Sequence, residues 1–235
     1  MKSVAIVQSS YIPWRGYFDL IRSVDEFILF DDMQYTRRDW RNRNRIKTPA
    51  GLQWLTIPVR GSHRRRIDEV KLVDRGWAPD HWRSLRHNYA RAPLFERYAD
   101  RIQALYDEAT DLRLSAINHH FILALCEMLG IDTPVRKSTD YSATGTKGAK
   151  LLNLCLAAGA TRYLSGPAAQ AYIDTAMFEG EGIEVEWMGY DGYPEYPQVH
   201  PPFEHSVTIL DLIFNTGPDA PTYMKGPRTA FDARA

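Results

Sequence analysis

The amino-acid sequence predicts an α/β fold: a three-layer, Rossmann-like domain with a mostly parallel sheet and a helical insertion at about 79–130. Short apolar strands alternate with helical segments at both ends of the chain, which is typical of a doubly wound parallel sheet. The stretch between these ends has helical periodicity only. With 235 residues, 44% of them hydrophobic, the chain can bury a large core in one domain.

The N-terminal third contains four predicted strands, one of them a short edge strand, and one helix. Residues 3–8 are short, apolar and rich in β-branched side chains, which predicts a strand. Apolar side chains then recur at helical spacing and predict a helix over 16–24. Further apolar runs predict strands at 26–30 and 54–59, and a short edge strand at 70–73.

The middle of the chain is predicted to be helical. Helical spacing extends over 79–110, with a restart at Pro93, and a second helix over 112–129 ends at Gly130. The C-terminal part returns to alternation, with predicted strands at 135–138, 161–164 and 183–187 and helices at 149–158, 168–178 and 207–215.

We expect one α/β domain over residues 1–217. The last residues, 218–235, are rich in Gly, Pro and polar side chains, which predicts a weakly ordered tail.

Charge and cysteine content limit the partners of the protein. The 29 basic and 29 acidic residues give zero formal net charge, so any phosphate binding must come from local clusters. Cys126 and Cys155 lie in apolar helical patterns, which favours buried free thiols and gives no support for a metal site. No signal peptide precedes the first strand, and no apolar run approaches the ~20 residues of a membrane span. We expect a soluble, cytoplasmic protein without a membrane partner.

Polar side chains follow the first two predicted strands. Gln8 comes after the first strand, and Asp31 and Asp32 come directly after the second. Ligands of open α/β sheets bind at the carboxyl ends of the strands. We therefore predict that one aspartate acts catalytically, by accepting hydrogen bonds from an amine, a ribose or a magnesium-bound water. The alternative is a helix cap and a surface carboxylate.

A basic and aromatic run comes next. Guanidinium groups bind phosphate or carboxylate in a bidentate manner, and aromatic rings stack on a base or a sugar. This pattern favours a nucleotide, a nucleotide sugar or a tRNA end over a solvated, salt-bridged loop. The predicted ligand-binding residues of the run are Tyr35, Arg37, Arg38, Trp40, Asn42, Arg43 and Asn44, with Arg41, Arg45 and Lys47 as further cations.

Three predicted helix starts are candidate anion sites, because free backbone N–H groups and the helix dipole favour negative charge there. Arg15 and Tyr17 flank a glycine at the first, and Ser165 and Gly166 open another. Lys147 precedes a third, although the loop lacks a P-loop pattern. The alternative is an ordinary helix start at which Trp14 is a packing residue. Ser165 also lacks the full Gly-x-Ser-x-Gly elbow, so an anion-binding turn is favoured over a nucleophilic serine.

The last candidate segment is rich in tyrosine and proline. Tyr196 and Gln198 belong to a loop that either covers a sugar pocket or crosses over the sheet, and the sequence does not separate these two readings. His205 follows and is a candidate catalytic residue.

These segments together resemble the WbqC-like family. The matching stretches follow in order through most of residues 3–217: Gln8 with Tyr11–Phe18, Asp31–Tyr35, Trp40–Asn44, Trp54–Val59, Tyr163–Pro167, Tyr196–Gln198 and Ser206–Leu212. The family occurs in bacterial loci for surface-polysaccharide (O-antigen) biosynthesis, and one role suggested for it is glycine transfer to a sugar. A remoter resemblance is to the nucleotidyltransferase and pantothenate-synthetase superfamily. Its His-x-Gly-His motif corresponds in position to Trp14–Tyr17, which has neither histidine, so only the architecture is implied.

The residues and the resemblance lead to a preferred function. We expect transfer of an activated aminoacyl or acyl group, glycyl for example, onto an amino group of a sugar nucleotide or related small metabolite. Asp31 or Asp32 would orient or deprotonate the amine, and the pocket would be walled by Tyr11, Trp14, Tyr35 and Trp40. Two alternatives are a nucleotidyltransferase or ligase that uses a nucleoside triphosphate and a non-catalytic binding module of a biosynthetic complex.

The expected partners follow from this function. The substrate would carry phosphate, and the donor would be an aminoacyl-tRNA or a carrier protein. No cofactor is firmly implied, and the sequence is compatible with magnesium or a nucleotide.

Overall fold

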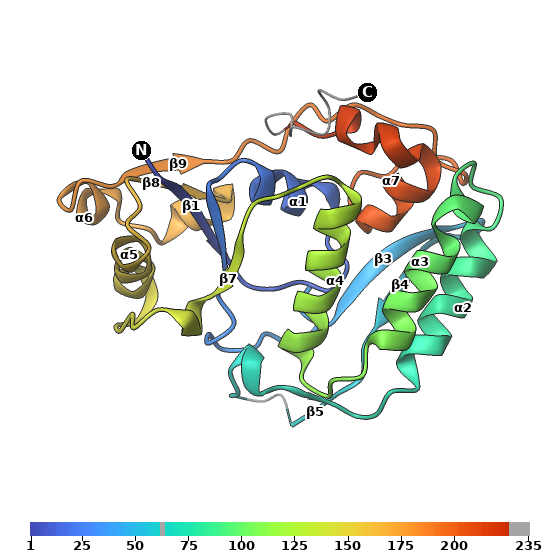
Figure 1. Ribbon diagram of the computed structural model, residues 1–235, viewed down its shortest axis with the longest axis horizontal. Coiled ribbons are helices and arrows are strands. Elements are labelled where there is room, and N and C mark those ends of the chain that lie inside the picture. Colours follow the sequence, from blue (N-terminus) through green and yellow to red (C-terminus); the bar gives the residue numbers. More distant parts are fainter. Residues whose placement is uncertain (62–63, 226–235) are drawn as a thin grey trace.

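A five-stranded, all-parallel sheet forms the centre of the computed structural model, which describes residues 1–61 and 64–225 (Figure 1). Its strand order is β7-β2-β1-β8-β9. The bounds are β1 (Ser3–Val7), β2 (Glu26–Leu29), β7 (Val135–Lys137), β8 (Arg162–Ser165) and β9 (Glu184–Trp187). The predicted Rossmann-like parallel sheet is thereby confirmed.

The chain builds this sheet outward from β1 in two directions. β2 and then β7 are added on one side, and β8 and then β9 on the other. The register pairs Ile6 with Ile28 and Val4 with Tyr163. The direction of winding reverses between β1 and β8, and such a switch point leaves a crevice at the carboxyl ends of the strands.

Helices cover both faces of the sheet, because successive strand residues point to opposite sides. Ala5, Phe27 and Leu29 belong to one apolar core, together with side chains of α1 (Arg15–Arg22) and α4 (Leu114–Met128). Alternate strand residues, such as Val4 and Ile28, belong to a second core with α5 (Lys147–Ala157) and α6 (Thr175–Glu179). The three predicted layers are present.

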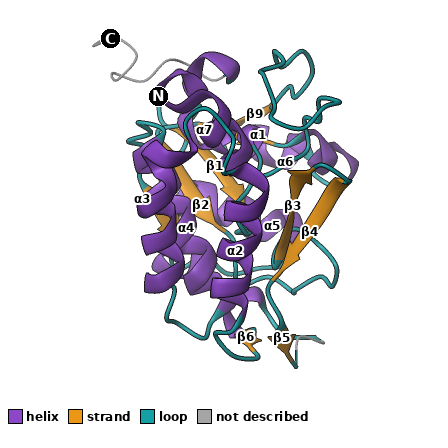
Figure 2. Ribbon diagram, turned by 90° about the vertical axis from the view of Figure 1, so that its right-hand side faces the viewer, coloured by secondary structure: helices purple, strands orange, loops and turns teal. Residues whose placement is uncertain are grey.

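A long insertion between β2 and β7 contains the predicted helices. It begins with a hairpin of β3 (Arg43–Thr48) and β4 (Gly51–Thr56) and a small sheet of β5 (Val59–Arg60) and β6 (Lys71–Leu72). Helices α2 (Trp77–Tyr89) and α3 (Phe95–Glu108) then lead to α4. Figure 2 shows the hairpin beside the helices.

The predicted strand at 54–59 is therefore divided between β4 and β5 and does not enter the main sheet. Its partner, β3, contains the second part of the basic run, for which no strand was predicted. β3 has few apolar side chains, so its sequence shows no apolar alternation typical of a strand. Its buried and half-buried positions are set by the face that packs against the rest of the fold.

The C-terminal region also differs from the prediction. The helix expected at 168–178 is split into a short 3-10 helix, η3 (Pro167–Ala171), and α6, whose start is capped by Asp174 through the Ala176 amide at 3.2 Å. The last α-helix is α7 (Ile209–Thr216), and all its residues are buried.

The chain stays packed beyond residue 217, where the sequence predicted a weakly ordered tail. Residues Gly217–Tyr223 form the 3-10 helix η4, and Ala220 and Met224 are buried in the core. The Lys225 amide donates to Asp19 Oδ2 at 2.8 Å. The buried Ala220 and Met224 side chains and the hydrogen bond from Lys225 to Asp19 thus hold this segment. Residues 226–235 of the predicted tail lie outside the described residues.

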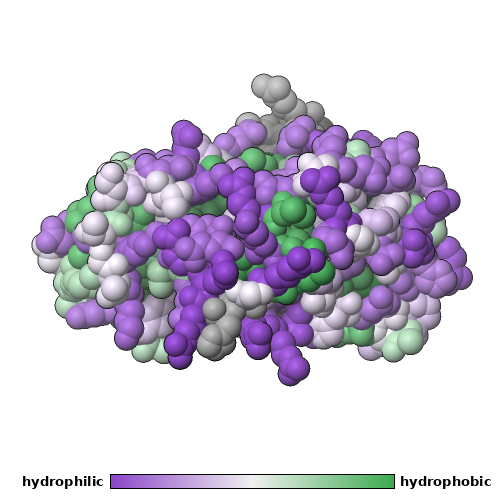
Figure 3. Space-filling view, turned by 90° about the horizontal axis from the view of Figure 1, so that it is seen from below, coloured by the Kyte–Doolittle hydropathy of each residue, from purple (hydrophilic) through white to green (hydrophobic). Residues whose placement is uncertain are grey.

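Two surface properties complete the fold. Within the described ranges, no helix combines the length and the apolar character that a bilayer crossing requires. The face on the β5 side is hydrophilic over most of its area, with apolar side chains gathered near its centre (Figure 3).

Candidate functional site

A cavity of about 550 Å³ lies at the switch point of the sheet. Gln8 lines it from the end of β1, and Ser165 and Gly166 line it from the end of β8. Tyr17 contributes from α1 and Lys147 from the start of α5. Five residues that were predicted to bind substrate therefore meet here from four separate parts of the chain.

Aromatic rings form much of the wall of this cavity. Trp14, Tyr163, Tyr172 and Tyr190 all line it. The Trp14 ring packs against Tyr190, with ring centroids 5.2 Å apart, and Tyr172 is 66% exposed. Such walls suit a ligand with a ring system, while the one lining cation, Lys147, suits a negative charge.

A second cavity, of about 310 Å³, adjoins the first. Both are lined by Val7, Trp14 and Tyr17. The other residues of the smaller cavity come from two loops, the hairpin and the segment before α7: Ser10, Pro13, Trp40, Arg41, Asn44 and Ser206. The Trp14 and Tyr17 side chains thus form a common wall between two compartments.

Gly16 is required by the position of the Trp14 ring. A Cβ atom at Gly16 would lie 2.3 Å from the nearest ring carbon of Trp14, which is far inside van der Waals contact. The glycine at this helix start is therefore explained by the packing of the Trp14 indole over the backbone.

The loop after β1 is held in a strained conformation. Ile12 has a φ of +37°, a value that is unfavourable for a β-branched residue. Its carbonyl accepts hydrogen bonds from Asn44 Nδ2 and from Thr208 Oγ1, both at 2.8 Å. These bonds hold a conformation that costs of order 1–3 kcal/mol, and such strain is concentrated at functional sites.

Asn118 on α4 joins the two loops that line the smaller cavity. Its side-chain amide donates to Ser9 Oγ at 3.0 Å and to the Arg41 carbonyl at 2.9 Å. The Tyr11 amide also donates to the Trp40 carbonyl at 3.0 Å. Asn118 was not among the predicted site residues, because a helical pattern does not distinguish an amide that links distant loops from any other polar side chain.

Arg41 lines the smaller cavity and is only 8% exposed. Its Nε and Nη1 atoms are buried without a hydrogen-bond partner. In the sequence, Arg41 is one of several cations of the basic run and does not differ from its neighbours. Only burial distinguishes it, and burial was not readable from the charge pattern.

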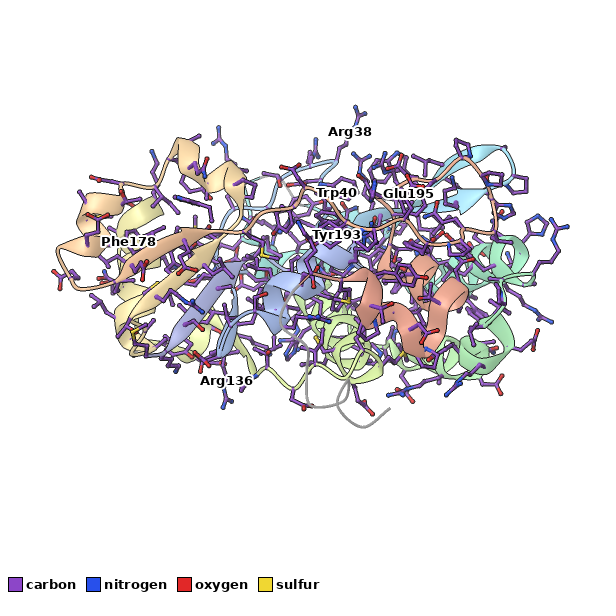
Figure 4. The ribbon with its side chains drawn as sticks, turned by 90° about the horizontal axis from the view of Figure 1, so that it is seen from above. Arg38, Trp40, Arg136, Phe178, Tyr193 and Glu195 are labelled. Carbon is purple, nitrogen blue, oxygen red and sulfur yellow. The ribbon has the colours of Figure 1, made fainter. Side chains whose placement is uncertain are left out.

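The half-buried Arg43 stacks on an exposed tryptophan of the hairpin region. The Arg43 guanidinium lies 4.0 Å from the Trp54 ring centroid, and the rings of Trp40 and Trp54 are 5.3 Å apart. Figure 4 shows Arg38 pointing outward from the rim, with Trp40 and Tyr193 nearer the middle of the molecule. Of the predicted residues Arg37, Arg38 and Arg43, none lines either cavity.

Asp31 and Asp32 do not reach these cavities. Both line a separate hollow of about 220 Å³. Asp32 forms an ion pair with Lys150 and accepts a hydrogen bond from Ser138 Oγ at 2.6 Å. Although burial raises its pKa, these hydrogen bonds lower the pKa below its ordinary value overall. The two cavities are therefore not lined by either aspartate, and a catalytic role for Asp31 or Asp32 stays a prediction.

The Asp31 side chain is buried, and its hydrogen bonds and nearby charges only partly offset the cost of burying a carboxylate. Its Oδ1 accepts a hydrogen bond from the Ser9 amide at 2.8 Å, and burial raises its pKa from 3.8 to about 6. Between about pH 4 and 6 the unfolded chain loses this proton while the folded chain keeps it. The free energy of unfolding therefore falls as the pH rises through this window, by roughly 3 kcal/mol in total.

We predict that Asp31→Asn removes this loss, because an amide oxygen still accepts from Ser9 but does not ionise. The variant should exceed the wild type in stability by about 1–3 kcal/mol at pH 7.5 and match it more closely at pH 4.5. Urea denaturation at both pH values measures the difference. Asp32→Asn is the matched control and should be less stable than wild type at pH 7.5. Equal pH dependence of wild type and Asp31→Asn would contradict this assignment.

Several other predicted binding residues are structural. Tyr11 is fully buried, and its hydroxyl lies 2.9 Å from both His81 Nδ1 and the Tyr106 hydroxyl. The buried Tyr35 hydroxyl donates to Asn42 Oδ1 at 2.8 Å, and Asn42 in turn donates to a backbone carbonyl. These aromatic and amide groups look like ligand contacts in sequence, but they satisfy one another inside the fold.

Arg15 and His205 contact each other. The Arg15 guanidinium, 2% exposed, lies 2.6 Å from His205 Nδ1 and donates to the Pro194 carbonyl at 2.8 Å. It also lies 4.6 Å from the Tyr193 ring centroid. Arg15 thus anchors the C-terminal segment instead of binding an anion, and His205 lines neither cavity.

Tyr196 and Gln198 bind a buried carboxylate. The Tyr196 hydroxyl donates to Asp211 Oδ1 at 2.7 Å, and Gln198 Nε2 donates to the same atom at 2.9 Å. Tyr89 from α2 donates to Asp211 Oδ2 at 2.7 Å. The tyrosine-rich segment is therefore a crossover fixed to α7 at this point, and its predicted lid role is not supported for these two residues.

The fold and the two cavities define a Rossmann-like α/β protein with a candidate ligand site at the carboxyl edge of its parallel sheet. The chain belongs to the WbqC-like protein family, which it matches over residues 8–223. It is 51% identical over 227 residues to an uncharacterized protein of Mycobacterium tuberculosis, which covers 96% of this chain and 98% of the relative. No solved structure matches the chain.

Proposed function

We propose that this protein is a transferase that moves an activated aminoacyl or acyl group, such as glycyl, onto an amino group of a sugar nucleotide or related small metabolite. The observation that carries the proposal is the pair of cavities that share the Trp14 and Tyr17 wall. Group transfer requires donor and acceptor to be held with their reacting atoms in contact. Two adjoining compartments of unequal size supply that arrangement.

The larger compartment suits the sugar nucleotide. Its volume of about 550 Å³ is within the usual range for small-molecule sites. Tyr172 and Tyr190 offer stacking surfaces for a base or a sugar, and Lys147 offers a positive charge for a phosphate. The smaller compartment would then hold the group-donating end of the second substrate.

The lining residues favour catalysis by positioning. Among the described residues, the charged side chains that line the two cavities are Lys147 and Arg41, and none is a carboxylate. Alignment of the substrates and neutralisation of negative charge would therefore supply most of the rate. Membership of the WbqC-like family adds the expectation, taken from that resemblance, that the product enters surface-polysaccharide biosynthesis.

Calorimetric titration with nucleotides and sugar nucleotides tests binding, and transfer of labelled glycine from charged tRNA without added triphosphate tests the reaction. Lys147→Gln should weaken sugar-nucleotide binding about tenfold, because it removes one charge-assisted contact. Lys71→Gln, on the remote strand β6, is the matched control and should bind as wild type does.

The other outcomes separate the alternatives. Consumption of a nucleoside triphosphate would favour a ligase-like enzyme over the proposed transferase. Absence of binding across the whole panel would contradict the proposal and favour a non-catalytic binding module.

A further inference from the structure

The smaller cavity contains a buried positive charge whose hydrogen-bonding groups are unused. Arg41 is 8% exposed, and two of its guanidinium nitrogens, Nε and Nη1, are buried without a hydrogen-bond partner. Within the described residues, no hydrogen bond or ion pair of this guanidinium is present. A buried charge without partners is strongly unfavourable, and buried polar groups in folded proteins are nearly always satisfied.

The Asp31 carboxylate interacts with Arg41 electrostatically but forms no hydrogen bond with its guanidinium. The positive charge of Arg41 lowers the pKa of Asp31, which burial raises, but the two side chains form no ion pair. Asp31 Oδ1 is already engaged by the Ser9 amide. The carboxylate thus offsets part of the charge and leaves the guanidinium donors available to a group inside the cavity.

We infer that the smaller cavity is an oxyanion subsite, in which Arg41 binds the phosphate or carboxylate of an organic ligand whose apolar body lies against Trp14 and Trp40. The inference rests on the proposed function only in taking this cavity as the second substrate site. A guanidinium is suited to either oxyanion, because it presents several N–H donors in a rigid plane.

The rest of the lining agrees with such a ligand. Ser10 and Ser206 add hydroxyl groups, and Trp14, Tyr17 and Pro13 add apolar surface. Trp40 is 38% exposed, so one side of the cavity borders solvent and allows entry. The ligand is therefore expected to combine one anionic group with a flat or aliphatic body.

The subsite is also preorganised. The Arg41 backbone is fixed by Asn118, and the preceding carbonyl, of Trp40, by the Tyr11 amide. Asn44 joins the hairpin to the Tyr11 and Ile12 carbonyls at 3.1 and 2.8 Å. A guanidinium on a fixed backbone loses little freedom on binding, which favours affinity.

Calorimetry with three probes tests the subsite: phenyl phosphate, benzoate and the neutral benzamide. Wild-type protein should bind at least one of the two anions and bind benzamide at least 30-fold more weakly. Arg41→Gln should lose at least 30-fold in affinity for that anion. Arg41→Lys should retain part of the affinity, because lysine keeps the positive charge but lacks the planar, bidentate N–H donors of a guanidinium. Arg38→Gln is the matched control, because Arg38 is exposed and lines neither cavity, and it should bind within about twofold of wild type.

A thermal shift gives a second readout. Saturating anion, at about a hundred times its Kd, should raise the Tm of wild type by roughly 5–10 °C and leave Arg41→Gln unchanged. Without ligand, Arg41→Gln should melt at or above the wild-type temperature, because it removes an unpaired buried charge.

Equal affinity of wild type for benzamide and the anions, or wild-type anion affinity in Arg41→Gln, would overturn the subsite. The benzamide comparison uses wild-type protein alone and so decides the matter even if the variant does not fold. Preference for phenyl phosphate or for benzoate identifies the oxyanion. Anion binding without glycyl transfer would count against the proposed function and leave the subsite in place. Glycyl transfer by a protein that binds neither anion would overturn the subsite and leave the proposed function in place.

Discussion

Gly16→Ala is expected to abolish most ligand binding, although alanine normally stabilises a helix. Glycine to alanine inside an α-helix contributes about 0.5–1 kcal/mol of stability when the added methyl group has space. Here the methyl carbon would lie 2.3, 2.6 and 2.7 Å from three ring carbons of Trp14. The indole must therefore move, and it is the wall that both cavities share.

Overpacking of this kind typically lowers the free energy of unfolding by 1–3 kcal/mol, so the sign of the stability change should be the opposite of the helix preference. We expect at least tenfold weaker binding in both compartments, because binding requires well-placed walls. Urea denaturation and calorimetry measure the two effects.

Gly148→Ala on α5 is the control for Gly16→Ala. Its added methyl group would meet only the flexible tip of Met177, at 3.4 Å, so stability should be unchanged or slightly higher. A Gly16→Ala protein that is as stable as wild type and binds ligands normally would show that Trp14 is free to move and is not a fixed wall.

Asp211→Ala is expected to cause a large loss of stability. Asp211 is fully buried, and burial raises its pKa. Its carboxylate accepts hydrogen bonds from Tyr89, Tyr196 and Gln198, so one side chain joins α2, the C-terminal crossover and α7. The alanine variant leaves the buried Tyr89 and Tyr196 hydroxyls without this acceptor, removes one of the acceptors of Gln198 and opens a cavity. We expect a loss of roughly 3–5 kcal/mol.

The exposed Asp219 on η4 provides the comparison for Asp211, since Asp219→Ala should change stability by less than about 0.5 kcal/mol. Denaturant titration of both variants with a common slope gives the difference. A loss below about 1 kcal/mol for Asp211→Ala would mean that water or repacking satisfies the two tyrosine hydroxyls.

Most of the predicted site residues that line the larger cavity share one property: they follow parallel strands or begin the helices after them. Gln8, Ser165 and Lys147 meet at one cavity because parallel strands bring their carboxyl ends to one edge. Several residues that were predicted from their chemical type alone lie inside the fold and line neither cavity. Tyr11, Asn42 and Gln198 are polar enough to bind a ligand, yet the fold consumes their hydrogen bonds internally.

The parallel sheet, its helical insertion and the edge at which a site should form could be predicted from the amino-acid sequence, because the period of apolar residues and the places where strands end are local properties of the chain. Membership of the WbqC-like family could be predicted in the same way. Which cation faces a cavity depends on the folded arrangement. Arg37, Arg41 and Arg43 look alike in sequence, but one is exposed, one is stacked on Trp54, and Arg41 alone among these three is buried beside a cavity without a hydrogen-bond partner. Burial and hydrogen-bond satisfaction depend on segments far apart in the chain, and no local pattern encodes them.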